Sequence, residues 1–132
     1  MLWIGQAAVV TLPAEIDVTI AEAVRDELLA ILDQDAALLI ADLSKTEFCD
    51  SAGVSALVRT YRQASTSGSA MRLVVGTPSV QRVLAITGVD RLVEVFPSVA
   101  ASLAGTPGSA DQVQPADSAT ADSATADTDG GA

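Results

Sequence analysis

The chain has 132 residues, with 7 Lys or Arg against 17 Asp or Glu, a formal net charge of −10; it contains no histidine and one cysteine. The absence of histidine excludes Ser-His-Asp and Cys-His catalysis and His-ligated zinc. One cysteine cannot form an internal disulfide or a metal site built from cysteines alone. So acidic a chain is unsuited to nucleic acids, because their phosphates select Lys and Arg. A chain of this length is expected to form one domain, with or without a tail, and we expect no metal or cofactor site.

The composition changes near Gly105. Residues 1–105 hold nearly all of the large apolar side chains, whereas residues 106–132 hold five aspartates, no Lys or Arg, and a repeat of Ala-Asp-Ser-Ala-Thr that begins at Ala116. A period of five matches neither helix nor strand, so it presents no steady apolar face. The sequence predicts a folded domain over 1–105 and a disordered acidic Ala/Asp/Ser/Thr repeat tail over 106–132. The tail is either a regulatory or solubilising arm with Ser and Thr phosphoacceptors, or a neutral repeat expansion.

The N-terminal segment lacks the features of a secretory signal. No basic residue precedes its apolar run, and Pro13, Glu15 and Asp17 interrupt that run early. No stretch approaches the ~20 apolar residues of a membrane span. We therefore expect a cytoplasmic protein without membrane contact, in which Cys49 stays a free thiol.

Apolar runs and turn residues predict alternating strands and helices. Strands over 2–4 and 8–12 flank Gly5, which predicts a hairpin. Thr19 and Glu22 fit the capping box of a helix. Its apolar stripe follows at helical spacing, at Ile20, Val24, Leu28 and Ile31. The continuous apolar run over 38–41 predicts a strand that is covered on both faces.

The second half of the chain continues this alternation. A helix is predicted from Ser51 to a stop at Gly68. A strand over 71–75, a helix opened by Thr77-Pro78 and closed by Gly88, a strand over 92–96 and a short helix to Ala104 follow. The predicted fold class is α/β: a small sheet, mostly parallel, with an antiparallel N-terminal edge hairpin and about four helices. Functional groups are expected in the loops over 14–19 and 42–51, beyond the carboxyl ends of two strands.

The most distinctive local sequence surrounds Ser51, at the start of the second long helix. Free backbone N–H groups and the positive end of the helix dipole favour a phosphate there. Such a phosphate would add about −1.5 to −2 charges and change what docks without unfolding the helix. The alternative is that Asp50 or Ser51 only caps the helix. Gly53 is unusual in a first turn, and either a close approach by another backbone or a partner, or local packing, would explain it.

Four short segments match one protein family in order: Leu12-Pro13-Ala14-Glu15-Ile16-Asp17, Leu39-Ile40-Ala41-Asp42-Leu43-Ser44, Phe48-Cys49-Asp50-Ser51-Ala52-Gly53-Val54 and Thr87-Gly88-Val89. The third is similar to the family's Phe-hydrophobic-Asp-Ser-Ser/Ala-Gly-Leu signature. From about Ala8 to Ala104 the chain therefore resembles a STAS domain, in particular the bacterial anti-sigma factor antagonists.

The resemblance implies that Ser51 is a phosphoacceptor. The unphosphorylated antagonist binds an anti-sigma factor that is also a GHKL-type serine kinase, and so frees the sigma factor. Phosphorylation by that kinase ends the binding, and a PP2C-type phosphatase resets the switch. The protein would be a substrate rather than an enzyme, and monomeric when free. The alternative is a STAS module, in a scaffold or a transport complex, that binds a partner constitutively and has no phospho-switch.

Partner-binding residues are expected on both loops and on the first turns of the helix that starts at Ser51. They are Asp17, Thr19, Glu47, Asp50, Ser51, Val54 and Ser55. Asp50 either orients Ser51 or a kinase-bound metal, or only caps the helix. Asp17 is either a partner contact or a local cap.

Two positions depart from the family pattern. Ala14 stands where the family has glycine, and a positive φ there would strain alanine. Ile20 stands where the family has threonine, which alters a contact on the same loop. Phe48 either flanks Ser51 or joins the core. Cys49 is expected to be a buried small hydrophobe.

Overall fold

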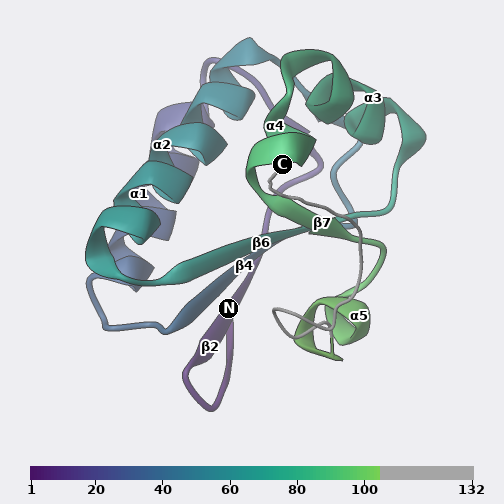
Figure 1. Ribbon diagram of the computed structural model, residues 1–132. Helices are drawn as coiled ribbons and strands as arrows, with labels where there is room; N and C mark the ends of the chain where they lie inside the picture. Colours follow the sequence, from purple (N-terminus) through teal and green to yellow (C-terminus); the bar gives the residue numbers. More distant parts are fainter. Residues whose placement is uncertain (105–132) are drawn as a thin grey trace. The chain divides into compact units, whose positions relative to one another are not determined.

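The computed structural model describes residues 1–104, so the predicted repeat tail over 106–132 lies outside the described residues. Residues 1–102 form one compact unit, and the chain from Leu103 onward belongs to a second. In chain order the elements are β1 (Leu2–Ile4), β2 (Ala7–Thr11), β3 (Glu15–Ile16), α1 (Ala21–Leu32), β4 (Leu38–Leu43), β5 (Phe48–Cys49), α2 (Ser51–Ser67), β6 (Ala70–Val75), α3 (Pro78–Thr87), α4 (Val89–Leu92), β7 (Glu94–Phe96) and α5 (Val99–Ala104) (Figure 1).

The main sheet has five strands in the order β1-β2-β4-β6-β7. β1 pairs antiparallel with β2, and every other neighbour in this sheet is parallel. Gly5, with φ +62°, makes the turn between β1 and β2, a conformation that glycine adopts without strain. The predicted α/β class, the mostly parallel sheet and the N-terminal hairpin are therefore confirmed.

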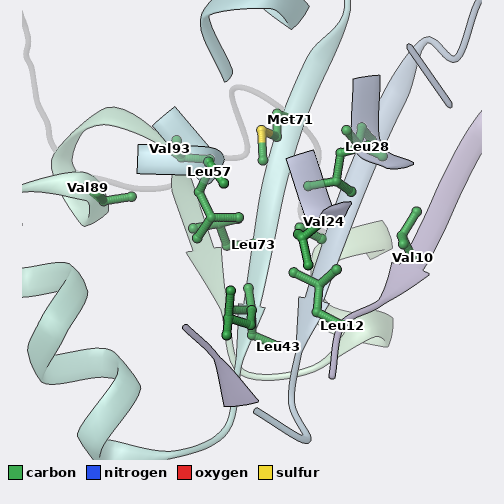
Figure 2. Packing of buried hydrophobic residues seen from close by; sticks show 14 of the residues in the cluster. Val10, Leu12, Val24, Leu28, Leu43, Leu57, Met71, Leu73, Val89 and Val93 are labelled. Atoms are coloured by element: carbon green, nitrogen blue, oxygen red, sulfur yellow. The ribbon is translucent and has the colours of Figure 1, made fainter. Parts of the chain in front are cut away.

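The hydrophobic core lies between one face of the sheet and the helices. Helices α1 and α2 lie side by side along this face (Figure 1). Alternate strand residues supply one side of the core, and Figure 2 shows Leu73 of β6 beside Leu57 of α2, with Leu43 of β4 and Leu28 of α1 in the same cluster. Because β2 and β4 are parallel neighbours, their carboxyl ends lie at the same edge of the sheet, from which the chain continues through β3 to α1 and through β5 to α2.

Two local predictions are wrong. Thr19 does not cap α1: the N-cap is Ile20, which makes no side-chain cap hydrogen bond, while the Thr19 hydroxyl and amide both donate to the Asp17 carboxylate. The side chain of Asp17 competes successfully for those donors, as aspartate does in turns. The last strand begins at Glu94 rather than Leu92, because residues 89–92 form the extra helix α4. The chain therefore has five helices among its described residues.

A second, two-stranded sheet was not predicted. β3 pairs in parallel with β5, with Glu15 opposite Phe48 and Ile16 opposite Cys49. The Asp50 amide extends the pairing by donating to the Ile16 carbonyl at 3.1 Å, and the Thr46 hydroxyl donates to the Pro13 carbonyl at 2.8 Å. This small sheet joins the loop after β2 to the loop after β4.

Arg72 is a charged residue on the buried strand β6 and is only 3% exposed. Its Nη1 donates to the Ser102 carbonyl, and its guanidinium carbon lies 5.5 Å from the centre of the Phe96 ring. Its Nε lies 3.3 Å from Oε1 of Glu94, an ion pair without hydrogen-bond alignment. Arg72 thus connects its own strand β6 with β7 and with Ser102 near the end of the compact unit.

Gly53 sits where the first turn of α2 crosses the small sheet. A Cβ at this position would lie 2.6 Å from the Cys49 sulfur, 2.9 Å from Cγ2 of Ile16 and 3.1 Å from the Ile16 carbonyl oxygen. All three are closer than ordinary van der Waals contact. Local packing against the side chains of Cys49 and Ile16, together with the Ile16 carbonyl, therefore explains a glycine in this turn.

We expect Gly53→Ala to lower the free energy of unfolding by about 1–3 kcal/mol, the usual cost of overpacking. This loss outweighs the gain in helix propensity, which is at most about 1 kcal/mol. Urea denaturation measures the difference. Gly76→Ala is the matched control, because its nearest neighbour would be a carbonyl oxygen at 3.4 Å. Equal stability of the two variants would contradict the packing argument.

Candidate functional site

The candidate site lies where the small sheet meets the start of α2. Ile16 and Cys49 are paired, so Asp17 and Asp50 each follow directly from a paired position. The two loops singled out in the sequence are therefore held together by backbone hydrogen bonds rather than by side chains alone. Ser51 is the first residue of α2 and is exposed.

Asp50 is the N-cap of α2. Its backbone is extended, and its carboxylate accepts a hydrogen bond from the Gly53 amide at 3.0 Å. This satisfies one of the free donors of the first turn. Among residues 1–104, the Ser51 hydroxyl makes no hydrogen bond. Of the two capping hypotheses, the structure supports Asp50, and Ser51 is left available for other chemistry.

Cys49 lies beneath this turn and is 3% exposed. Burial raises the pKa of its thiol to about 11, and the neighbouring negative charge of Asp50 acts in the same direction. A thiol with so high a pKa is neutral and unreactive near neutral pH. The prediction that Cys49 is a small buried hydrophobe is confirmed.

The loop between β3 and α1 forms the opposite side of the site. The pKa of Asp17 is lowered, because the hydroxyl and then the amide of Thr19 donate to its carboxylate. Its carbonyl accepts from the amides of Ile20 and Ala21. Asp17 therefore acts as a local cap that fixes this loop, and it leaves Val18 at the tip, 72% exposed.

The other edge of the site is formed by β5 and the start of α3. Phe48 is 51% exposed, so it flanks the site and is not part of the core. The Ser79 hydroxyl donates to the Glu47 carbonyl at 3.1 Å, and the Thr77 hydroxyl donates to the Thr46 carbonyl at 2.8 Å. These bonds attach the loop before Ser51 to α3. Two exposed apolar side chains, Val18 after β3 and Phe48 in β5, belong to the two segments that the small sheet joins near Ser51.

The predicted partner-binding residues do not all reach the surface. Thr19, Glu47, Ser51 and Ser55 are exposed, and Asp17 and Asp50 are half-buried. Val54 is only 8% exposed and belongs to the hydrophobic core, so its side chain faces inward. The sequence analysis missed Val18, whose only signal was its place beside Asp17 in the loop.

The departures from the family pattern do not distort the site. Asp35 is the one residue other than glycine with positive φ in the described part of the chain, so Ala14 carries no backbone strain. No group of three or more potential metal ligands occurs among residues 1–104. What the site offers is an exposed hydroxyl at a helix N-terminus, surrounded by a rigid surface.

A family model for the STAS domain matches residues 4–102. The chain belongs to the STAS domain family. An anti-sigma factor antagonist from Mycobacterium paratuberculosis is a similar solved structure, with 26% identity and a TM-score of 0.72 over 78% of this chain and 87% of the other. No curated protein sequence gives a significant match. None of the helices in this STAS domain, over the described residues, has the length and apolar character to cross a membrane.

Two further solved structures share the STAS fold. The unphosphorylated anti-sigma factor antagonist SpoIIAA has 18% identity and a TM-score of 0.67 over 78% of this chain and 90% of the other. A sulfate transporter family protein from Wolinella succinogenes has 17% identity and a TM-score of 0.64 over 79% of this chain and 87% of the other. At these identities the likeness establishes the fold alone.

We expect Asp50→Ala to destabilise this STAS domain by about 1 kcal/mol, the usual cost of removing an N-cap. Asp50→Asn is the matched control, because its amide oxygen still accepts from the Gly53 amide. Thermal or urea unfolding compares the two. A loss of equal size in both variants would show that the charge of Asp50, rather than its capping bond, stabilises the turn.

The raised pKa of Cys49 predicts a decline in stability at alkaline pH. The thiol ionises near pH 9 when unfolded and near 11 when folded. Between these values the unfolded chain has released the proton while the folded chain still holds it, so unfolding becomes easier as pH rises. The unfolding free energy of the wild type should fall relative to that of Cys49→Ala across this window. Parallel pH profiles would contradict the burial of the thiol.

Proposed function

We propose that this STAS domain is an anti-sigma factor antagonist that is switched by phosphorylation of Ser51. In the unphosphorylated state it binds an anti-sigma factor with GHKL-type serine kinase activity and frees the sigma factor. Phosphorylated, it releases the kinase, and a PP2C-type phosphatase restores it. The chain acts as a cytoplasmic substrate and switch rather than an enzyme, and it is monomeric when free.

The observation that carries this proposal is the free hydroxyl of Ser51. Asp50 has taken the capping role, so a phosphate on Ser51 breaks no hydrogen bond among the described residues. The helix N-terminus stabilises the added negative charge. Phosphorylation therefore leaves the fold intact and acts on what docks against it.

The surroundings of Ser51 explain why a phosphate would oppose docking. Val18 and Phe48 are exposed apolar side chains on the two segments that the small sheet joins near Ser51. A partner that covers them together with the start of α2 removes water from residue 51. A hydroxyl loses little on desolvation, whereas a group with about −1.5 to −2 charges loses much more. Asp17, Thr19, Glu47 and Ser55 complete the proposed docking surface at its edge.

Similar structures support the choice of partner. They include an anti-sigma factor antagonist from Mycobacterium paratuberculosis and SpoIIAA in both its unphosphorylated and phosphorylated forms. A second candidate function has its own support, because a sulfate transporter family protein has the same fold. In that case the chain is a constitutive STAS interaction module in a scaffold or transport complex, and Ser51 has no switching role.

Wild type, Ser51→Ala and Ser51→Asp, used as baits in an extract of the source organism with ADP, distinguish the two functions. We expect wild type and Ser51→Ala to retain a GHKL-type ATPase, and Ser51→Asp to retain at least about tenfold less, because the carboxylate imitates part of the phosphate charge. When ATP replaces ADP, mass spectrometry should find phosphate on Ser51 of the wild type, which then releases the ATPase, whereas Ser51→Ala should keep it.

Ser67→Asp is the charge control, because it adds the same charge at the opposite end of α2. It should bind like the wild type. Equal capture by all four proteins, or capture of membrane transporter components without an ATPase, would favour the constitutive module instead.

A further inference from the structure

A groove runs between α1 and α2 and begins beside the candidate site. Its first part is a depression of about 470 Å³ whose apolar wall is formed by Val18, Ala21, Ala52 and Ala56. A second depression of about 410 Å³ continues it toward Gln63 and Thr66. Arg25 and Arg59 line both depressions, so the two form one continuous groove.

The length of the groove fits a segment of protein rather than a small ligand. From Ala52 to Thr66 along α2 it extends for about 21 Å, at ~1.5 Å per helical residue. A helix of about four turns would fill this length. Helix-in-groove binding typically places an apolar face on the groove floor, and the alanines at the end near Ser51 provide that floor.

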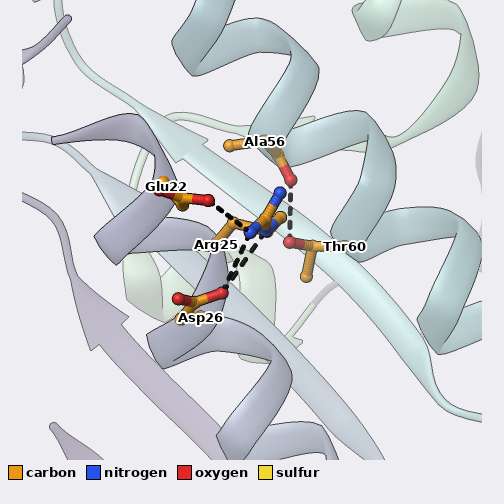
Figure 3. Close-up of polar contacts among 5 residues, drawn as sticks. All are labelled: Glu22, Arg25, Asp26, Ala56 and Thr60. Atoms are coloured by element: carbon orange, nitrogen blue, oxygen red, sulfur yellow. Dashed lines mark hydrogen bonds and ion pairs between the residues drawn. The ribbon is translucent and has the colours of Figure 1, made fainter. Parts of the chain in front are cut away.

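The charge of the groove contrasts with that of the chain. Three of the seven basic residues line it, Arg25, Arg59 and Arg62, although the net charge is −10. Two carboxylates also line the groove, Glu22 and Asp26, and both are paired with Arg25, at 3.3 and 3.2 Å (Figure 3). Arg59 and Arg62 have no ion-pair partner among residues 1–104 and are exposed.

We propose that the groove between α1 and α2 binds an acidic helical segment of the partner protein, with the apolar end of that segment beside Ser51 and its carboxylates on Arg59 and Arg62. Arginine pairs with carboxylates through two parallel hydrogen bonds, which makes it well suited to such recognition. The overall negative charge disfavours nucleic acid in the same groove. This inference rests on the proposed function for the identity of the partner and for the role of Ser51.

The position of the groove links it to the phosphorylation site. Ser55 lines the groove one helical turn beyond Ser51, a separation of about 6 Å. This is shorter than the ~8 Å over which salt screens charges in the cell. A phosphate on Ser51 therefore lowers the electrostatic potential at the groove entrance, and an acidic segment is repelled before its apolar end can dock.

The test uses the ¹⁵N-labelled full-length chain and a synthetic peptide of about 16 residues, long enough for four helical turns. The peptide carries leucines in its first turn and glutamates over the remaining turns; a second peptide carries glutamine in place of glutamate. We expect the glutamate peptide to shift backbone amide signals of residues 18–29 and 52–66 at low salt, and the glutamine peptide to bind much more weakly.

Charge reversal locates the binding. The double variant Arg59→Glu/Arg62→Glu should bind the glutamate peptide at least about tenfold more weakly, because both ion pairs become repulsive. The double variant Arg82→Glu/Arg91→Glu changes the net charge equally, but its two substitutions lie on α3 and α4. Its affinity for the glutamate peptide should fall by less than about twofold. Ser51→Asp should weaken binding of the glutamate peptide severalfold, while the peptide still contacts the same residues.

Several outcomes would overturn the inference: no shifts, shifts elsewhere, equal binding of both peptides, or equal losses in the two double variants. If the Arg59→Glu/Arg62→Glu change alters signals of residues 106–132 without peptide, the occupant is the chain's own acidic segment. If the Arg59→Glu/Arg62→Glu change abolishes self-association measured by sedimentation, the occupant of the groove is a second copy of this chain. If the peptide does not bind in the groove, the capture experiment can still show that Ser51 controls partner binding. If Ser51 has no switching role, the peptide can still bind in the groove.

Discussion

The candidate site depends on the contact between Gly53 and the strand pair β3–β5. Because residue 53 has no side chain, the first turn of α2 lies directly against Ile16 and Cys49. That contact fixes the direction in which α2 leaves the sheet, and it places Ser51 at the surface with Asp50 beside it. A larger residue would have to move either the helix or the loop that carries Val18, and both belong to the proposed docking surface.

Each of the polar residues around Ser51 has a task in this arrangement. Asp50 accepts from the Gly53 amide, and Asp17 fixes its own loop through Thr19. The carboxylates that looked like candidates for partner recognition thus hold the backbone in place. The consequence is a surface whose loops are fixed by hydrogen bonds, on which the Ser51 hydroxyl is free to accept a phosphate. A phosphate there changes the affinity for a partner without breaking those bonds.

Much of this fold could be predicted from local sequence. Gly68 and Gly88, both with positive φ, end α2 and α3 where the pattern placed their ends, and Pro78 begins α3. Asp50 was one of two capping residues that the sequence left open, and the hydrogen bond from the Gly53 amide decides for it. The helix at 89–92 was missed, since four residues are too few to show a period. Thr19 was misassigned because its hydroxyl and amide donate to the Asp17 carboxylate, while the Asp17 carbonyl accepts from the amides of Ile20 and Ala21 at the helix start.

The sequence by itself determined the alternation of the main-sheet strands with the longer helices, the buried stripes and the position of Ser51 at a helix start, because these depend on neighbours along the chain. Only the tertiary structure decided that 15–16 pairs with 48–49, that Phe48 faces outward, and that Arg25 lines one groove with Arg59 and Arg62. The strand pair and the groove join segments that are more than 30 residues apart in the sequence. No local pattern encodes such contacts, because they arise when the helices pack on a common face of the sheet.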